Sequence, residues 1–271
     1  MSTYMKATLL NIVSILCLLG SNIDDTCAQN INTTTSDGEY AHYKVYYNWH
    51  FIWLNAGEVT FSTQKTDHNN QQLFKLQAIG KTIGNYDHFF FVRDTFISVT
   101  DTLTLQPHTF YQSNYEGKKI VRNTYHFDHG KQRISGTEYI KDGRTIKSNK
   151  KIDIPWDGNS FDVMTMVYKA RNINFSQCQV GDKIPISMII NAQVYNLYIR
   201  YLGRETITTK HGQTYQCQKF SPLLVEGTIF AGGEDMTVWV TDDEWHVPVV
   251  VEAKILIGSV KAILDKYENK K

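Results

Sequence analysis

Three consecutive carboxylates, Asp242-Asp243-Glu244, form the densest acidic cluster of the chain. Paired carboxylates bind calcium or act as the general acid and base of glycoside hydrolysis. Consecutive residues of a turn point in different directions, however, so these side chains do not converge on one point. We therefore favour a turn in which Asp242 and Asp243 accept backbone N–H groups over a catalytic or calcium site.

His126 and His129 are the histidines with the best spacing for two metal ligands. They flank Phe127-Asp128 in a segment with the composition of a hairpin turn, and no nearby Cys or Glu completes a ligand set. The chain also has no Gly-x-Ser-x-Gly motif, phosphate-binding loop or dinucleotide fingerprint. We therefore predict no metal, no cofactor and no catalytic residue, and do not expect an enzyme.

The segment from Tyr43 to Trp53 is the strongest candidate for a ligand-binding surface. Aromatic residues recur at its odd positions, among them Tyr47, Trp49, Phe51 and Trp53. In one β-strand these side chains would share a face. Such a wall suits a lipid, a glycan or a peptide. Filling of a barrel interior explains the same residues without a ligand.

One segment has helical spacing, from Phe161 to Arg171, and Ser160 can cap its start. Asp162 in the first turn and Arg171 in the last suit the helix dipole, which is the structural interpretation of both charges. If Arg171 instead projects into a cavity, it is the best anchor for an anionic headgroup or a carboxylate.

The remaining pattern predicts an antiparallel meander. Turn signals recur roughly every 8–12 residues without helices between them, which is typical of all-β architectures. The 16 tyrosines outnumber the 13 phenylalanines, which favours strands with wet faces over a helical bundle. We predict one mainly β domain over residues 40–267, a strongly coiled sheet or incomplete barrel with one main helix packed on it. Residues 29–39 are expected to be a loose leader and 268–271 a tail.

Two turns are predicted within this meander, together with one irregularity. Asn55-Ala56-Gly57 has the composition of a turn after the aromatic strand, and residues 241–246 separate two alternating runs as a hairpin. After Gly258 the apolar residues move from odd to even positions. A strand changes face in this way when one residue is inserted, so we place a β-bulge at Gly258-Ser259.

Residues 1–28 have the features of a secretory signal peptide: Lys6, an apolar segment and Thr26-Cys27-Ala28 before Gln29. Cleavage there leaves no transmembrane span, so we expect an exported protein of the periplasm or one associated with the outer membrane. Of the remaining cysteines, Cys178 and Cys217 either form a disulfide or stay as buried thiols. The formal net charge of +1 gives no footprint for nucleic acid.

Four parts of the chain resemble an exported bacterial family, the domain of unknown function numbered 3108. They are a Tyr-rich opening strand leading to Asn55-Ala56-Gly57-Glu58; the helix with Asp162, Tyr168 and Arg171; Gly203-Arg204-Glu205 with Cys217; and a closing motif that contains Trp239, Asp242, Asp243, Pro248 and Gly258. The resemblance implies a mostly β envelope protein and supplies no catalytic residues. An analogy with the open β-barrel of periplasmic lipoprotein carriers concerns the fold and does not fix function.

We therefore carry three functional hypotheses. The first is a non-enzymatic periplasmic or cell-envelope carrier for an amphiphilic small molecule, a lipid or lipid-like ligand. The second is a structural or assembly factor that offers a sheet edge or aromatic patch to an outer-membrane protein. The third is a glycan-acting hydrolase, which requires two carboxylates facing each other across a groove.

Overall fold

The protein is organised around one large antiparallel sheet. The computed structural model describes residues 27, 31–49, 52–68, 71–88, 91–210, 212–225, 233–254 and 258–270. Their strands form a 15-stranded sheet in the order β8-β7-β6-β5-β4-β3-β2-β1-β15-β14-β13-β12-β11-β10-β9. The first strand pairs with the last, so β1 and β15 lie side by side in the middle of the sheet. β8 and β9 are its two edges, and the sheet is not closed into a barrel. The predicted mainly β, incompletely closed fold is confirmed.

The strands before the helix are β1 (Tyr40–Trp49), β2 (Ile52–His68), β3 (Gln71–Thr82), β4 (Val92–Asp101), β5 (Pro107–Glu116), β6 (Lys119–Asp128), β7 (Arg133–Asp142) and β8 (Thr145–Pro155), with the 3-10 helix η2 (Gly84–His88) between β3 and β4. The later elements are β9 (Phe161–Asp162), α1 (Val163–Ala170), η3 (Phe175–Gln177), β10 (Lys183–Ile190), β11 (Gln193–Thr208), β12 (Thr214–Pro222), β13 (Met236–Thr241), β14 (Pro248–Lys254) and β15 (Ser259–Glu268).

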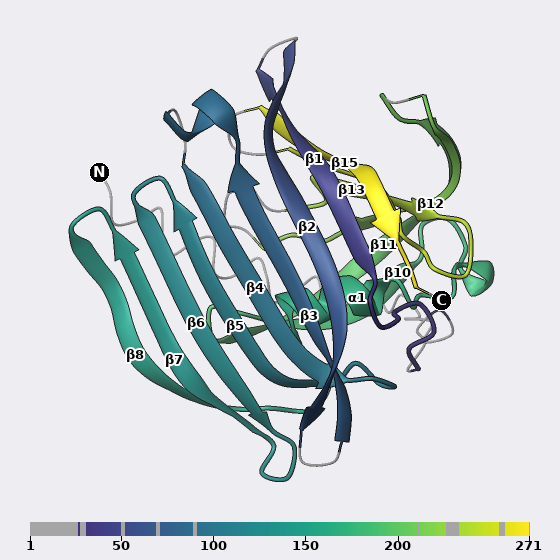
Figure 1. The fold of residues 1–271 in the computed structure, drawn as a ribbon. Coiled ribbons are helices and arrows are strands. Elements are labelled where there is room, and N and C mark those ends of the chain that lie inside the picture. The colour runs from purple at the N-terminus through teal and green to yellow at the C-terminus, as the bar shows by residue number, and fades with distance from the viewer. Residues whose placement is uncertain are drawn as a thin grey trace, which may run out of the picture.

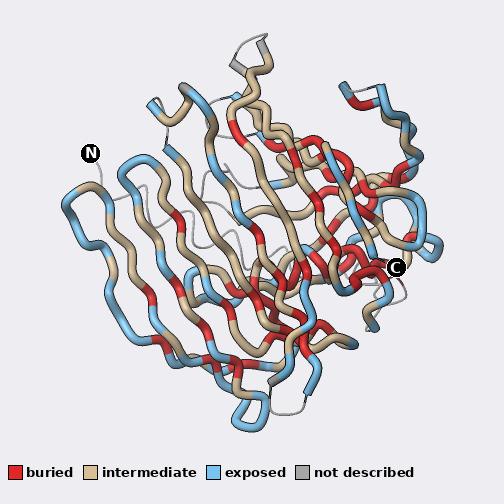
Figure 2. Tube along the Cα trace, viewed as in Figure 1, coloured by how far each residue is buried: buried red, intermediate tan, exposed pale blue. Residues whose placement is uncertain are grey.

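The sheet curls around α1. Figure 1 shows β1–β8 as one curved wall, with β10–β13 passing behind it and α1 lying between the two halves. We call the face toward α1 the inner face. Its apolar residues form one core cluster that joins β3–β8 to α1 and β10, and a second that joins β10–β13 to the segment after α1. Buried residues accordingly concentrate around α1 and along the adjoining halves of β3–β7 (Figure 2).

The helix begins two residues later than the sequence suggested, at Val163. Asp162 is its N-cap, and the carboxylate accepts the Thr165 N–H at 2.9 Å and the Ser98 hydroxyl at 2.6 Å. The prediction that Ser160 caps the helix is wrong, because its hydroxyl is bonded to Asp157 and Ser187. Asp162 thereby ties the helix to the inner face of β4.

The chain reverses at two places where the sequence predicted otherwise. The β1–β2 ladder pairs Trp49 with Ile52, so β1 ends and β2 begins before Asn55-Ala56-Gly57, which lies inside β2. Near Gly258, β14 and β15 pair with each other in an antiparallel ladder. The predicted β-bulge is therefore wrong: the apolar positions change parity because the chain turns back. The predicted hairpin over residues 241–246 is confirmed as the β13–β14 connection.

Residues 31–39 pack against the fold, contrary to the loose leader that the sequence predicted. Thr34, Thr35, Ser36 and Glu39 are all buried. Their segment is held by a side chain just after α1, since the side-chain oxygen Oδ1 of Asn172 accepts the backbone N–H groups of Thr33 and Thr34. A polar segment becomes ordered here because the fold supplies its hydrogen-bond partners.

Candidate functional site

Three polar side chains lie on neighbouring inner positions of β4, β5 and β6. Asp94 is directly opposite Asn114, and Asn123 is opposite Gln112, two residues before Asn114. Side chains alternate between the two faces of a strand. Asp94 shares its face with Ser98, which contacts Asp162 of the helix cap, and Asn123 shares its face with the core residue Tyr125. All three therefore point inward, and we call Asp94, Asn114 and Asn123 the acceptor cluster.

The acceptor cluster contains buried oxygens that accept no hydrogen bond from the protein. Asn123 is fully buried and Asn114 is 8% exposed. One side-chain oxygen of each residue of the cluster, Oδ1, is buried without a hydrogen-bond partner. The amide of Asn123 does donate to Gln112 Oε1 at 3.1 Å, which fixes the direction of its carbonyl. A buried acceptor without a donor costs roughly 1–3 kcal/mol, so these oxygens are suited to receive donors from a bound molecule.

The carboxyl of Asp94 differs from an ordinary surface aspartate. Its pKa is raised to about 7, chiefly by burial and in addition by the nearby Glu116 carboxylate, while the Tyr115 backbone N–H opposes both effects. Glu116 lies two residues beyond Asn114 on the same face of β5. Asp94 therefore changes charge near neutral pH and acts as either an acceptor or a donor of a hydrogen bond.

An apolar row faces inward on the other half of the sheet. Tyr47 pairs with Val260, Val260 with Ala253 and Ala253 with Met236, across β1, β15, β14 and β13. We call these four residues the apolar wall. Tyr47, Val260 and Met236 are only partly buried, although they point into the curl of the sheet. Between the wall and the acceptor cluster, Gly80 lies opposite Asp94, and a Cβ added to it would be in van der Waals contact with Val59 Cγ2 at 3.6 Å and Asp94 Cβ at 3.8 Å.

The four aromatic candidates do not form one face. Because β1 and β2 pair antiparallel, Tyr47 is opposite Leu54, and Trp53 is opposite Asn48. Tyr47 thus points inward and Trp53 outward, where Lys261 lies 4.9 Å from the Trp53 ring centre. The prediction of one aromatic wall is wrong for this pair. Phe51 and the side chain of Trp49 lie outside the described residues.

Arg171 is a buried structural charge. Its Nη1 lies 2.6 Å from Glu39 Oε1, and Nη2 donates to the carbonyl of Thr34. Nε and Nη2 both donate to the carbonyl of Trp245. Arg171 lines a cavity of about 220 Å³ together with Asn172 and His246. Most of its donors are nevertheless engaged by the protein, which favours the structural interpretation over an anion anchor.

The helical residues of the family motif also make internal contacts. Asp162 is fully buried, and burial raises the pKa of its carboxyl, although the hydroxyls of Ser98 and Thr165 oppose that shift. The Tyr168 hydroxyl accepts a hydrogen bond from Thr63 at 3.2 Å, and burial raises the pKa of this phenol. Both residues fasten α1 to the inner face of the sheet.

The closing motif is a turn with specific bonds. Asp243 accepts the N–H groups of Trp245 and His246, as the turn interpretation predicts. Asp242 instead accepts from the side chain of Gln218 at 2.5 Å and lies near Arg204. The other motif residues are similarly engaged: the Trp239 indole donates to Glu205, and the Pro248 carbonyl accepts the Tyr43 hydroxyl.

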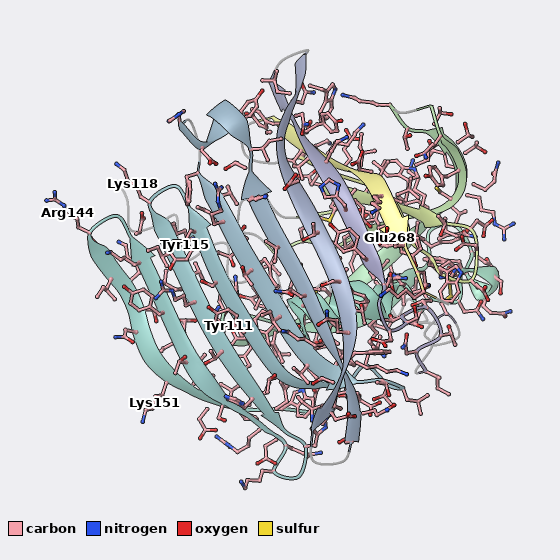
Figure 3. All side chains as sticks on the ribbon, viewed as in Figure 1. Tyr111, Tyr115, Lys118, Arg144, Lys151 and Glu268 are labelled. Carbon is pink, nitrogen blue, oxygen red and sulfur yellow. A yellow bond between two sulfur atoms is a disulfide. The ribbon has the colours of Figure 1, made fainter. Side chains whose placement is uncertain are left out.

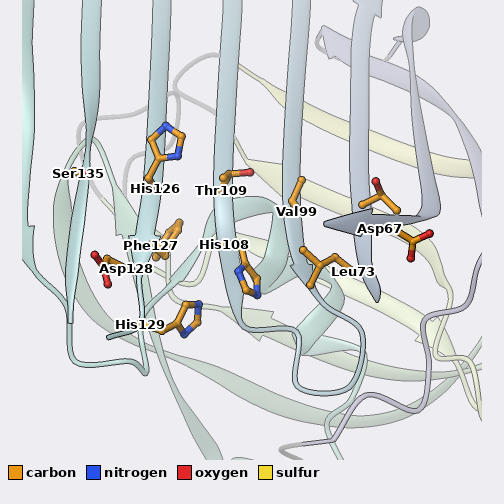
Figure 4. A pocket seen from close by; sticks show the side chains of 11 residues that line it. Asp67, Leu73, Val99, His108, Thr109, His126, Phe127, Asp128, His129 and Ser135 are labelled. Carbon is orange, nitrogen blue, oxygen red and sulfur yellow. The ribbon is translucent and has the colours of Figure 1, made fainter. Parts of the chain in front are cut away.

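An open groove of about 570 Å³ runs over the outer face and the ends of β3–β7. Figure 4 shows Val99, Thr109 and His126 along it, with His108 and His129 at the strand ends. The rings of His108 and His129 are 4.9 Å apart, and His129 Nε2 lies 3.0 Å from the carbonyl of Pro107. Within the described residues, no group of three or more His, Cys, Asp or Glu side chains is placed to hold a metal ion.

The cysteines match neither of the two alternatives that the sequence left open, a Cys178–Cys217 disulfide or two buried thiols. Cys178 forms a disulfide with Cys27, with Cα atoms 5.7 Å apart, and Cys217 is a buried free thiol. A Cys178–Cys217 disulfide is therefore wrong. Burial raises the pKa of the Cys217 thiol to about 12, helped by the Asp242 carboxylate, so it is unreactive as a nucleophile.

Comparison with known proteins agrees with this architecture. A family described as a protein of unknown function, DUF3108, matches residues 42–265. The chain belongs to the DUF3108 family. A crystal structure of a beta-barrel-like protein of the domain of unknown function DUF1849 from Brucella abortus has a TM-score of 0.55 and 8% sequence identity to this DUF3108 protein. The similarity covers 88% of this chain and 100% of that one, and it concerns the fold. No curated protein matches this DUF3108 chain.

Sequence reasoning missed the acceptor cluster of this DUF3108 protein. Asn114 and Asn123 are polar residues in alternating strands, where a solvent-facing position is the ordinary expectation. The sequence signal that could have found them is their position in the strand, odd or even, relative to the apolar residues of the same strand. Asn114 shares its parity with Phe110, and Asn123 shares its parity with Tyr125 and Phe127, so a polar residue occupies the apolar face. Of the helices in the described parts of the chain, none has the length and apolar character to cross a bilayer.

Proposed function

We propose that the protein is a non-enzymatic carrier of the cell envelope that binds an amphiphilic small molecule on the inner face of its sheet. The supporting observation is that this face combines an apolar wall with buried, unpartnered acceptors. An amphiphile matches both regions, because its chain covers the half-buried apolar residues and its headgroup supplies hydrogen-bond donors. The open edges of the sheet provide a way in.

The experiment compares two neighbouring positions of β13 that point to opposite faces. Met236 belongs to the apolar wall, whereas Thr237 faces outward opposite Glu252. Binding of an environment-sensitive naphthylamine fluorophore is measured for the unmodified protein, Met236→Arg and Thr237→Arg. Because a charge in the apolar wall must be desolvated by the bound chain, we expect Met236→Arg to weaken binding by at least about tenfold. Thr237→Arg should bind as the unmodified protein does.

Mass spectrometry of gently purified protein supplies the independent test, since an occupied carrier should release a lipid-like molecule on denaturation. Circular dichroism and the melting temperature establish that both variants are folded. The proposal is wrong if the unmodified protein carries no such molecule and does not bind the fluorophore, or if the two arginine variants lose binding equally.

The assembly-factor hypothesis finds less support in the edge of the sheet. β8 is the long free edge, and Lys147, Lys150 and Lys151 are spaced along it. Figure 3 shows Lys151 and the turn residue Arg144 projecting outward from this margin. Lysines on an edge strand are a common defence against pairing with another strand. This edge therefore does not favour β-strand addition to a partner.

The hydrolase hypothesis meets a geometric difficulty on the inner face. Asp94 and Glu116 are neighbours on adjacent strands of one wall. Glycoside hydrolysis instead needs two carboxylates on opposite sides of the bond to be cleaved. The pair is therefore better suited to contact a headgroup from one side.

A further inference from the structure

We propose that the acceptor cluster selects a headgroup rich in hydrogen-bond donors, namely hydroxyls or a protonated amine, and rejects anionic headgroups. This inference rests on the proposed carrier function and specifies its ligand. It is carried by the unpartnered Oδ1 oxygens of Asp94, Asn114 and Asn123. Asn114 and Asn123 are each more than nine-tenths buried.

Hydrogen-bond chemistry defines what these oxygens accept. A carbonyl or carboxylate oxygen binds N–H and O–H groups, and a phosphate or ionised carboxylate has none to offer. The nearest inner cation along the same row is Lys150, which is already bonded to Glu138 at 3.3 Å. Glu138 also accepts the Ser148 hydroxyl. The polar groups beside the cluster are thus satisfied among themselves, while the cluster is not.

The charged side chains around the acceptor cluster also disfavour an anionic headgroup. The strand register places four carboxylates and two lysines on inner positions from the cluster toward the ends of β4–β8: Asp94, Glu116, Glu138, Asp142, Lys119 and Lys150. The excess of negative charge disfavours an anionic headgroup and favours a cationic or neutral one.

The test uses amphiphiles with one ten-carbon chain and different headgroups, each below its micelle concentration, in competition with the naphthylamine fluorophore. The series is decylamine, decyl glucoside, decanoate, decyl phosphate and decyltrimethylammonium. The last has a positive charge but no N–H donor. We expect decylamine or decyl glucoside to bind at least about tenfold more tightly than the two anions and than decyltrimethylammonium, because a site built for hydrogen bonds rejects analogues that lack the donor.

Variants locate the selectivity at the cluster. Asn114→Leu and Asn123→Leu remove an acceptor at similar volume, and we expect each to reduce the preference for donors to less than about threefold. Thr124→Val is the matched control, since Thr124 is adjacent to Asn123 and bonds Thr137 on the outer face. Asp94→Asn distinguishes the ammonium headgroup from the hydroxyl headgroup. It should weaken the binding of decylamine more than that of decyl glucoside, because only the ammonium forms an ion pair with a carboxylate.

Each outcome bears on one of the two proposals. Binding of all five compounds with similar affinity, or a preference for the anions, would overturn the headgroup assignment and leave the carrier function in place. The assignment is also wrong if decyltrimethylammonium binds as tightly as decylamine. Asparagine variants that gain stability but keep the preference for donor-bearing headgroups would show that these oxygens do not contact the headgroup, and would also overturn the assignment. If no compound binds, the carrier function fails and this inference fails with it.

Discussion

Arg171 Nη1 lies 2.6 Å from Glu39 Oε1, and each of the two side chains is only 5% exposed. The pair joins the end of α1 to the segment that precedes β1. Arg171 also donates to the carbonyls of Thr34 and Trp245, so one guanidinium connects three parts of the chain. A charge this deeply buried is retained only because its partners replace the hydration that it loses.

Arg171→Ala should lower the free energy of unfolding by about 3–5 kcal/mol, because it leaves the Glu39 carboxylate buried without its partner. The matched control is Arg133→Ala. Arg133 pairs with Asp153 at 2.7 Å, but its side chain is 44% exposed. Removing that exposed pair should cost less than about 1 kcal/mol. Urea denaturation of both variants measures the difference, and equal losses would contradict the structural role of Arg171.

Asp94 should make the protein less stable as pH rises toward neutrality. Its pKa rises from 3.8 to about 7 in the fold, chiefly through burial. Between these two values the folded protein binds more protons than the unfolded chain, so the free energy of unfolding falls with increasing pH. Asp94→Asn removes this effect, and its stability relative to the unmodified protein should increase between pH 4.5 and pH 8 by on the order of 1–3 kcal/mol, allowing for screening by solvent.

Asp128→Asn is the control for that titration. The Lys131 backbone N–H and ammonium hold the pKa of the Asp128 carboxyl below its ordinary value. A lowered pKa contributes stability that is present above the unfolded value and is lost as pH falls. The ordinary pKa of 3.8 and the lowered pKa of Asp128 in the fold both lie below this pH range. Asp128→Asn should therefore change little relative to the unmodified protein between pH 4.5 and pH 8 in urea unfolding, whereas Asp94→Asn gains stability. An increase in Asp128→Asn as large as that in Asp94→Asn would contradict the assigned environment of Asp94.

Local patterns in the sequence were sufficient for most of the fold. Alternation predicts the strands, helical spacing predicts the helix near Asp162, and the polar segment over residues 241–246 predicts the β13–β14 hairpin. These signals are local because side chains repeat every two residues in a strand and every 3.6 in a helix. The turn role of Asp243 is equally local, since it binds the N–H groups two and three residues ahead.

The remaining features depend on contacts between distant residues. The sequence from Trp49 to Ile52 contains no Gly, Asn or Pro to separate β1 from β2, so the prediction treated the two strands as one and put Tyr47 and Trp53 on the same face. Cys27 meets Cys178 across 151 residues. Asn114 and Asn123 become neighbours only through the pairing of β5 with β6. No pattern within a single strand identifies such a cluster, because the register of the pairing decides which side chains meet.

The disulfide should contribute strongly to stability because it closes a long loop. With Cys27 and Cys178 separated by 151 positions in the sequence, the loss of chain entropy in the unfolded state predicts a contribution of about 5 kcal/mol, as an upper value. Cys178→Ser should lose most of that contribution in urea denaturation and should be insensitive to reductant, whereas Cys217→Ser should keep the contribution and lose it when a reductant is added. Equal behaviour of the two variants would contradict the pairing.

The same disulfide makes a prediction about processing. Its formation requires that Cys27 remain in the folded protein, whereas the sequence suggested cleavage before Gln29. We expect a processed chain to begin after Cys17 and at or before Cys27, and its denatured, unreduced form to react with an alkylating agent at Cys217 alone. Intact-mass measurement reads both the first residue and the number of modified thiols. A chain that begins at Gln29 with two modified thiols would show that the disulfide does not form.

Gly258 is the glycine whose replacement should be most informative. Its φ of +84° lies in the region that L-residues avoid, and an added Cβ would lie 2.4 Å from the carbonyl oxygen of Asn48. Gly143, in the β7–β8 turn, has a φ of +56° but nothing within 4 Å of the added atom. Gly143→Ala should therefore cost about 1 kcal/mol for its backbone alone, whereas Gly258→Ala should cost clearly more, because β1 must also move away. Urea denaturation compares the two variants, and a Gly258→Ala loss no larger than that of Gly143→Ala would show that the backbone of β1 does not approach Gly258 this closely.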